Sequence, residues 1–427
     1  MYLLYVVHIS LNLIKFGVIF TLMNRIIYSF VLLLFSSILD LQAAYYDTLP
    51  MGRFNLQYRK IKTNSIVNSF DSSGVMVSNN IKFNLDANSI YGANEVLDNY
   101  FDELKSINPE AFNSFQIGQY EINPSANIEV DVYGFGFGLT NKTTVYFGVP
   151  FYRAVVNVEF KRTAGNNYNE IKEMLGESDS GIVGQITNGL PDITEGVIQT
   201  VLIDHYGTSP IGTWSGEGVG DIEAGIMHQI FRGKNFGALT KFGTIFPTGK
   251  MENPDILQDI SFGDGQVDAF VEAGIGGNFF GGSLEYTFNS RYTYQFSSQK
   301  TRRIPDMEGI SLGVNKTQIT EKLGNKFDTF SALKYEVFDV ISFQAAHIFN
   351  YQGAPEITSE NANLFGSFDS SYSQNIELRL AFNTVKKYMD NQKFFMPLEI
   401  SASLLKTLSG KNIQDITRST LQLSLFF

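Results

Sequence analysis

The chain has 427 residues, no cysteine and a formal net charge of −11. Without cysteine there are no disulfides and no thiolate metal ligands, and the negative charge argues against a general nucleic-acid binder. Hydrophobic residues make up 44% of the chain, which fits either two soluble domains or one large barrel. The order of residues along the chain therefore has to decide the fold class.

The amino terminus carries a predicted secretory leader. A short basic region at 23–25 precedes an apolar stretch at 26–35, and Leu-Gln-Ala at 41–43 ends in a small residue. We expect translation to start at Met23 and cleavage to occur near Ala43.

The predicted organisation is a leader over residues 1–43 followed by one barrel domain over 44–427. An uncleaved membrane anchor built from the two apolar runs before residue 44 is the alternative. Each run is short for a membrane span, and Lys15, Asn24 and Arg25 interrupt them.

The clearest strand is the segment SLEYTFNSRYTYQF, residues 283–296. Leu284, Tyr286, Phe288, Tyr292, Tyr294 and Phe296 share one face, and polar residues from Glu285 to Gln295 share the other. This alternation lasts for about a dozen residues, which is longer than the usual globular strand and close to the length that a tilted strand needs to cross a bilayer.

The same alternation recurs along the chain and predicts about twelve strands, within a range of 10 to 14. The regular segments are 221–230, 266–275, 331–337, 375–383, 397–404 and 421–427. Less regular candidates lie near 50–60, 126–139, 143–154, 237–247 and 341–352.

The connections between these segments alternate in length. Short turns are expected at 140–142, 232–235, 280–281 and 338–340, with a somewhat longer one near 386–394; long loops are expected at about 61–125, 162–218, 248–265, 298–326 and 353–372. Bacterial outer-membrane barrels combine short periplasmic turns with longer external loops. The sequence therefore predicts an all-β fold, a transmembrane antiparallel up-and-down barrel with long external loops and both termini in the periplasm.

The alternative fold is a soluble β-sandwich, which also alternates apolar and polar residues. Its strands are typically shorter, its loops need not alternate in length, and its apolar face should not be rich in tyrosine and phenylalanine.

The chain ends on a strand with no tail, which suits a barrel because the last strand must pair with the first. The ending resembles the terminal signature of Gram-negative outer-membrane proteins, which the barrel-assembly machinery reads. The matching residues are Leu421, Leu423, Leu425 and Phe427. The expected partners are this machinery, outer-membrane lipid and an unidentified small permeant, with no nucleic acid.

The middle of the chain resembles a narrower family, the outer-membrane channel-like proteins linked to the meta-pathway of phenol degradation. The motifs are YGFGFGLTNKTTVYFGVPFYRA (133–154), GEGVGDIEAGIMHQIF (216–231), KFGTIFPTGK (241–250) and FGDGQVDAF (262–270). The order and spacing fit over about residues 126–300, whereas Asn141 and the long insert at 162–213 depart from the family pattern. The resemblance implies a barrel that passes small, apolar or aromatic compounds, and it supplies no catalytic residue.

The polar faces of the strands are predicted to line the lumen. They carry ten carboxylates, Glu129, Asp131, Asp221, Glu223, Asp268, Glu272, Glu285, Glu336, Glu377 and Glu399, and four basic groups, Lys241, Arg291, Lys334 and Arg379. So many charges cannot lie unpaired in a dry core. The lumen is therefore either filled with water or narrow and cross-linked by ion pairs. If it is open, the excess of carboxylates predicts a modest preference for cations.

Two long segments have helical periodicity. Residues 94–115 are expected to form a helix on the outer rim of the barrel, and residues 168–203 either constrict the lumen or form solvated surface helices.

The predicted function is a passive outer-membrane channel for small solutes. A structural or surface-interaction barrel with a closed lumen and partner-binding loops is the alternative. A barrel enzyme is a weaker possibility, because His205 follows Asp204 in a long loop but no nucleophile elbow accompanies it. No motif implies a cofactor.

Overall fold

A computed structural model describes residues 46–427, apart from 92–94, 190–193, 307–311, 367 and 392–395. The predicted leader over 1–43 lies outside the described residues. Among the helices that the structure describes, none is both long and apolar enough to cross a membrane.

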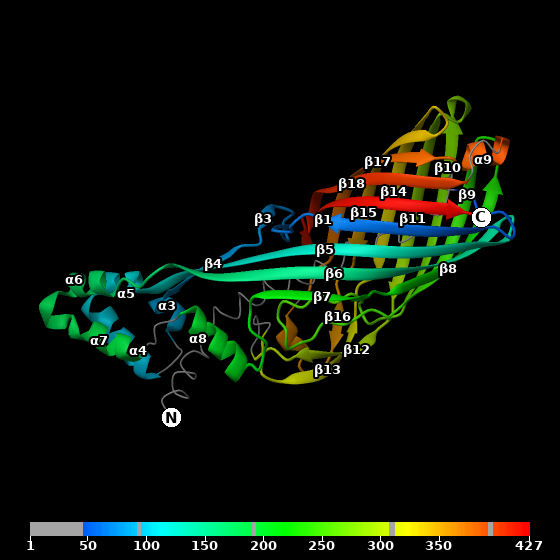
Figure 1. The fold of residues 1–427 in the computed structure, drawn as a ribbon. Coiled ribbons are helices and arrows are strands. Elements are labelled where there is room, and N and C mark those ends of the chain that lie inside the picture. The colour runs from blue at the N-terminus through cyan, green and yellow to red at the C-terminus, as the bar shows by residue number, and fades with distance from the viewer. Residues whose placement is uncertain (1–45, 92–94, 190–193, 307–311, 367, 392–395) are drawn as a thin grey trace.

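Twelve antiparallel strands close into a barrel (Figure 1), which confirms the predicted fold class and strand number. Around the barrel their order is β1-β20-β18-β17-β15-β14-β11-β10-β9-β8-β6-β5, and β5 pairs with β1 again. Neighbours in the barrel are neighbours in the chain, so the topology is up-and-down. The strands are β1 (Phe54–Thr63), β5 (Gln116–Thr140), β6 (Thr143–Ala164), β8 (Ile222–Arg232), β9 (Phe236–Phe246), β10 (Asp268–Phe279), β11 (Leu284–Gln295), β14 (Lys326–Val337), β15 (Ile341–Gln352), β17 (Ser371–Asn383), β18 (Leu398–Lys411) and β20 (Thr417–Phe426).

The first and last strands close the cylinder. Their register runs from Asn55 opposite Phe426 to Thr63 opposite Arg418. Phe54 and Phe427 exchange backbone hydrogen bonds of 3.1 and 2.9 Å, and their rings stack with centroids 5.2 Å apart. Closure leaves no unpaired edge between the two ends of the barrel domain.

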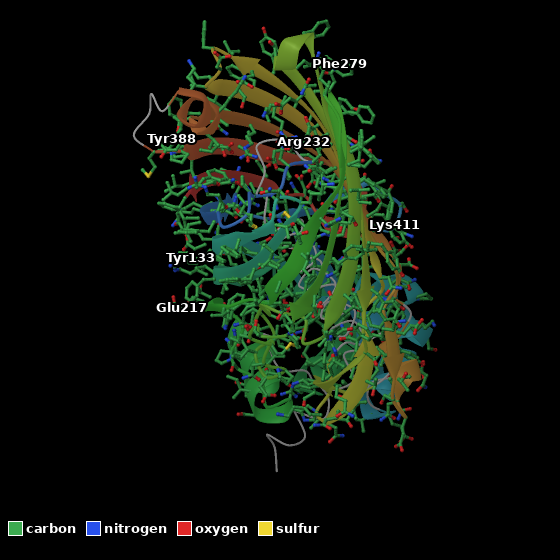
Figure 2. The ribbon with its side chains drawn as sticks, turned by 90° about the vertical axis from the view of Figure 1, so that its right-hand side faces the viewer. Tyr133, Glu217, Arg232, Phe279, Tyr388 and Lys411 are labelled. Carbon is green, nitrogen blue, oxygen red and sulfur yellow. The ribbon has the colours of Figure 1, made fainter. Side chains whose placement is uncertain are left out.

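The two faces of the wall have opposite polarity. On β11 the side chains of Tyr292 and Tyr294 are exposed, whereas Arg291 and Thr293, which alternate with them, are 7% and 2% exposed. Figure 2 shows side chains covering the outside of the sheet, among them Tyr133, which is 55% exposed. A soluble sandwich buries its apolar face, and this barrel exposes it, so the sandwich alternative is excluded.

Short hairpins lie at one end of the barrel. The turn after β14 places Phe338 and Asp339 at φ values of 58°, the left-handed pair of residues that a type I′ hairpin turn requires. The turn after β10 is the 3₁₀ segment η2 (Phe280–Gly282), in which Gly281 and Gly282 also have positive φ. Helix α9 (Val385–Asn391) fills the longer connection at this end.

The long connections at the other end contain secondary structure of their own. One small sheet joins β2 (Asn68–Phe70), β3 (Met76–Ser78) and β19 (Ile413–Gln414), and a second joins β12 (Ser298–Arg303), β13 (Lys316–Lys322) and β16 (Glu356–Thr358). Strand β7 (Thr213–Val219) pairs antiparallel with Phe151–Asn157 of β6, and η3 (Ala362–Phe365) follows β16.

Strands β5 and β6 are much longer than predicted, with 25 and 22 residues. Together with β4 (Ile81–Asp86), which pairs with the first residues of β5, they run past the barrel as a ribbon (Figure 1). The ribbon carries a helical module at its tip, made of α3 (Ala87–Ile90), α4 (Glu95–Ile107), α5 (Pro109–Ser114), α6 (Tyr168–Asp179), α7 (Gly181–Gly189), α8 (Glu195–Thr200) and η1 (Val201–His205).

The helical module corrects one expectation about the long loops and, for the segment 168–203, favours surface helices over a constriction of the lumen. The described part of the segment 94–115 does form the helices α4 and α5, but α4 packs on α5 and α7 rather than on the barrel rim. Within the module, Leu97, Phe101 and Leu104 are buried, as their spacing indicated. Helices α6 and α7 belong to the same module and lie away from the lumen (Figure 1).

The prediction that Glu129 and Asp131 point inward is wrong. On β5 it is Val130 and Val132 that line the interior, whereas Glu129 and Asp131 share the outer face with Tyr133, where neighbouring side chains cover Asp131 to 5% exposure. Their partners come from the outer faces of β1 and β6, with Arg153 Nη1 2.8 Å from Asp131 Oδ2 and Lys62 Nζ 2.5 Å from Glu129 Oε1. The prediction failed because the sequence before these residues alternates irregularly and so does not fix which side chains point inward. A shift of one residue moves every side chain of a strand to the opposite face.

Candidate functional site

A central ion-pair network occupies the inner face of β8 to β11. Arg291 donates two hydrogen bonds to Glu223, at 3.0 and 3.1 Å, and its Nε donates a third to Glu272 at 2.9 Å. Lys241 Nζ lies 2.9 Å from Glu272, and the Tyr146 hydroxyl donates to Glu223 at 2.9 Å. These four predicted lumen residues are all at least 90% buried, so their charges are paired inside the barrel.

The network results from the strand register. Lys241, Glu272 and Arg291 face one another on adjacent strands, because Glu272 pairs with Lys241 on one side and with Arg291 on the other. The Arg291 guanidinium also lies over the ring of Phe270, 3.9 Å from its centroid. The fixed planar geometry of the guanidinium suits this bidentate and stacked position, which a lysine cannot reproduce.

A second group of carboxylates lies where the wall meets the long loops. Asp221 accepts hydrogen bonds from the backbone N–H groups of Gly249 and Asp264, and so joins the loop after β9 to the start of β8. Asp268 accepts from Gln295 and lies 3.8 Å from Lys326. The sequence motifs GEGVGD, PTG and FGDG therefore meet at one buried point.

Three predicted residues lie nearer the short-turn end. Lys334 Nζ is 2.6 Å from Glu285 Oε2, and Glu336 lies 4.0 Å from Lys386 of α9. The acidic wall expected from Asp221, Glu223, Asp268, Glu272 and Glu285 is thus largely offset by bases on neighbouring strands.

The residues before β1 pack at the same end. The backbone carbonyl of Tyr46 accepts a 2.6 Å hydrogen bond from Gln229, and the Leu49 N–H donates to Thr144 at 2.9 Å. A Cβ on Gly237 would lie 2.6 Å from the Tyr46 ring, so only glycine leaves room for that ring. Tyr46 is consequently buried against the wall.

Glu377 and Arg379, the last two predicted residues, line an interior cavity of about 50 Å³, here called the arginine cavity. Its lining comes from eight strands, and the four strands that contribute nothing, β8 to β11, are those that carry the central network. Arg59 and Arg418 complete its charged wall, and the Arg379 Nη2 lies 2.6 Å from Glu399. The network therefore fills one side of the barrel, and space remains on the other.

A larger cavity of about 640 Å³, here called the vestibule, lies among the long loops. Its walls include the two small sheets β2–β3–β19 and β12–β13–β16, and apolar side chains such as Phe70, Ile81 and Phe368 alternate with charged ones. The volume lies within the range of about 300 to 1,000 Å³ that is common for ligand sites.

Charged side chains on one wall of the vestibule are strongly coupled. Lys300 and Arg302 lie 2.7 and 2.9 Å from Glu321. Burial alone would raise the pKa of Glu321, but the charges of Arg302 and Lys300 outweigh it and hold that pKa below its usual value. Burial raises the pKa of the neighbouring Glu252 carboxyl.

Sequence reasoning missed several interior groups. Arg59, Lys326 and Arg418 all lie at the ends of the predicted strands or beyond them, where the alternation of apolar and polar residues is weakest. Asp328, which accepts a 2.7 Å hydrogen bond from Asn350, precedes the segment 331–337 in the same way. Extending the predicted strands at constant period, by three residues for Asp328 and Arg418 and by five for Lys326, would have included them.

The predicted assembly signal lies on the outer face of β20. Leu421 and Phe427 are 60% and 42% exposed, whereas Gln422 and Ser424 are buried. The amphipathic pattern of the ending is therefore real, and its recognition by the assembly machinery stays a prediction.

The described residues contain no group of three or more His, Asp or Glu side chains placed to hold a metal ion. His205 ends η1 in the helical module, and its ring contacts Tyr206 edge-on. His228 lies on the outer face of β8 and bonds Thr143.

Comparison with solved structures finds the same barrel fold in an outer-membrane channel. An outer-membrane channel from Pseudomonas putida F1 superimposes with a TM-score of 0.50 and 11% identity, over 91% of this chain and 100% of that chain. The Pseudomonas putida toluene transporter TodX (TM-score 0.32, 9% identity, 90% of this chain and 91% of that one) and the monoaromatic hydrocarbon channel CymD (0.31, 8%, 89% of each) are more distant.

The first of these structures confirms the predicted resemblance at the level of the fold. No family model matches the sequence. No curated protein matches it either.

Proposed function

We propose that this protein is a channel of the bacterial outer membrane that admits small solutes through its barrel. The observation that carries the proposal is the vestibule of about 640 Å³ in the long loops of a closed barrel that is apolar outside and charged inside. A barrel with exposed aromatic side chains on its outer wall and charged side chains inside would be unstable in water. In a bilayer the outer wall contacts lipid, and the charged side chains are kept away from it.

Orientation and partners follow from the barrel architecture. Both ends of the barrel domain lie at the short-turn end, since Phe54 contacts Phe427. We infer that this end faces the periplasm and that the vestibule opens to the outside. The exposed aliphatic and aromatic wall would contact lipid, and the terminal strand would be read during assembly.

The proposed solutes are small and apolar or aromatic. This class is suggested by the sequence resemblance and is supported by the apolar part of the vestibule, which includes Phe70, Leu323 and Phe368. Charged groups between them, such as Lys300 and Glu321, would favour one orientation of a solute bound in the vestibule.

A second function is favoured by the central network and by the small size of the arginine cavity. The arginine cavity has a volume of only about 50 Å³, and the paired charges of Glu223 and Arg291 fill the other side of the barrel. Such a barrel would stay closed, and the helical module would then serve as a binding surface. The two functions differ in one measurable property, which is conductance.

Single-channel recording in planar bilayers tests the proposal. The chain has no cysteine, so a single introduced cysteine is the only target of a thiol reagent. In Ser72→Cys the thiol lines the vestibule, and attachment of a bulky reagent should lower the conductance. Ser178→Cys, on exposed α6 of the helical module, is the matched control and should be insensitive. A correctly folded protein that never conducts would refute the channel.

A further inference from the structure

The arginine cavity holds an excess of positive charge. Its charged lining consists of Arg59, Arg379, Arg418 and Glu377. Glu399 pairs with Arg379 at 2.6 Å, and Glu377 offsets one of the two remaining arginines. The lining itself therefore contains three arginines and one carboxylate.

Arg418 is the residue that carries this excess. Its Nε is buried, and within the described part of the chain that atom has no hydrogen-bond partner. No carboxylate oxygen of the described residues lies within 4.0 Å of its guanidinium, although Glu377 and Tyr152 are near enough to interact with its charge. Arg418 as a whole is partly exposed, but its buried Nε donates no hydrogen bond, so an anion bound there would stabilise it.

The rest of the wall is apolar on one side. Val130 and Val132 of β5, Pro150 of β6 and Ile348 of β15 line the cavity together with hydroxyl and amide groups of β18 and β20. A free inorganic anion would gain nothing from these aliphatic side chains. A ligand with a charged head and a short apolar tail would satisfy both walls.

We propose that the arginine cavity binds the carboxylate of a small organic acid, with its head on Arg59 and Arg418 and its tail against Val130, Val132 and Ile348. The volume of about 50 Å³ admits about three to five groups of the size of a water molecule, which matches acetate with its four heavy atoms. This inference goes beyond the proposed channel, whose solutes are apolar or aromatic, and concerns a separate site for an acid inside the same barrel.

Equilibrium dialysis of the full-length, detergent-folded protein against labelled acetate tests the site. Acetate should bind about fourfold more tightly than formate, because one more carbon contacts the aliphatic wall. Methylammonium should not bind. If formate and chloride displace labelled acetate as well as unlabelled acetate does, the site recognises negative charge alone, and the organic-acid proposal is overturned.

Matched variants separate the site from general effects on the barrel. Arg418→Gln and Arg59→Gln should each weaken acetate binding at least tenfold, Arg418→Lys should retain most of it, and Glu377→Gln should tighten it. Arg153→Gln, which removes an arginine from the outer face, should bind as the unaltered protein does. Heat-modified gel mobility would show that each variant is folded.

The two proposals fail separately. Unaltered acetate binding in folded Arg418→Gln, or no saturable binding to the unaltered protein, would overturn the acid site whether or not the barrel conducts. Acetate binding that depends on Arg418 in a barrel without conductance would support the site and refute the channel.

Discussion

Replacing Arg291 by methionine should destabilise the barrel strongly. The side chain makes three hydrogen bonds to carboxylates at 2.9 to 3.1 Å while 7% exposed. After the replacement Glu272 keeps Lys241, but Glu223 keeps only the Tyr146 hydroxyl. Leaving one buried charge uncompensated costs about 3–5 kcal/mol.

A second substitution identifies the cause of this loss. In Arg291→Met with Glu223→Gln, the uncompensated charge is gone and the Lys241–Glu272 pair remains. The double variant should therefore recover about 2 kcal/mol relative to Arg291→Met alone. Arg153→Met, which breaks a partly exposed pair on the outer face but leaves Asp131 its hydrogen bond from the Tyr58 hydroxyl, should cost under about 1 kcal/mol.

Urea unfolding in detergent micelles measures these differences. Trp214, the only tryptophan of the chain, lies 6.5 Å from the ring of Phe262 and should report the transition by fluorescence. A double variant as unstable as the sum of the two single variants would show that Arg291 and Glu223 are not coupled, and the reasoning from their geometry would fail.

Three further predictions address orientation, selectivity and pH. Epitope tags near Ser178, Asn315 or Ser359 should be labelled on intact cells and tags near Lys142 or Asp339 should not; the reverse pattern would contradict the assigned orientation. If the barrel conducts, replacing Asp268 and Glu272 by their amides should shift the reversal potential in a salt gradient toward anions, whereas Val271→Ile on the outer face should not change it. The pKa of Glu321 is lowered in the folded protein, so its contribution to stability is present above the usual value of 4.5 and is lost as the pH falls through the folded pKa. Limited proteolysis of the β12–β13–β16 sheet should accordingly accelerate in acid, and Glu321→Gln should remove that dependence; equal acceleration in both proteins would point to another group.

The sequence was sufficient to predict the wall of the barrel because each strand contacts two different environments. Alternation in segments such as 283–296 records that difference directly, and all twelve strands overlap the predicted ones. The ribbon was missed because Asn123, Pro124 and Ser125 are typical of a turn, yet Pro124 lies within β5 opposite Val158. The pairing of Arg291 with Glu223 could not be predicted, because these residues lie on strands that are not adjacent and meet only across the curvature of the interior.

The ribbon formed by β4, β5 and β6 is also a rigid extension that would move as one unit with its base. About ten residues of β5 extend beyond the isolated bridge of Ile66 to Ala126, which corresponds to a reach of about 33 Å. Its rings of Phe83, Tyr120 and Phe160 lie within 6.4 Å of one another and oppose bending. A rotation of about 10° at the base would displace the tip by about 6 Å over that length. A pair of spectroscopic labels, one on the barrel wall and one on α4, would therefore amplify small movements of the base into a distance change that is easily measured.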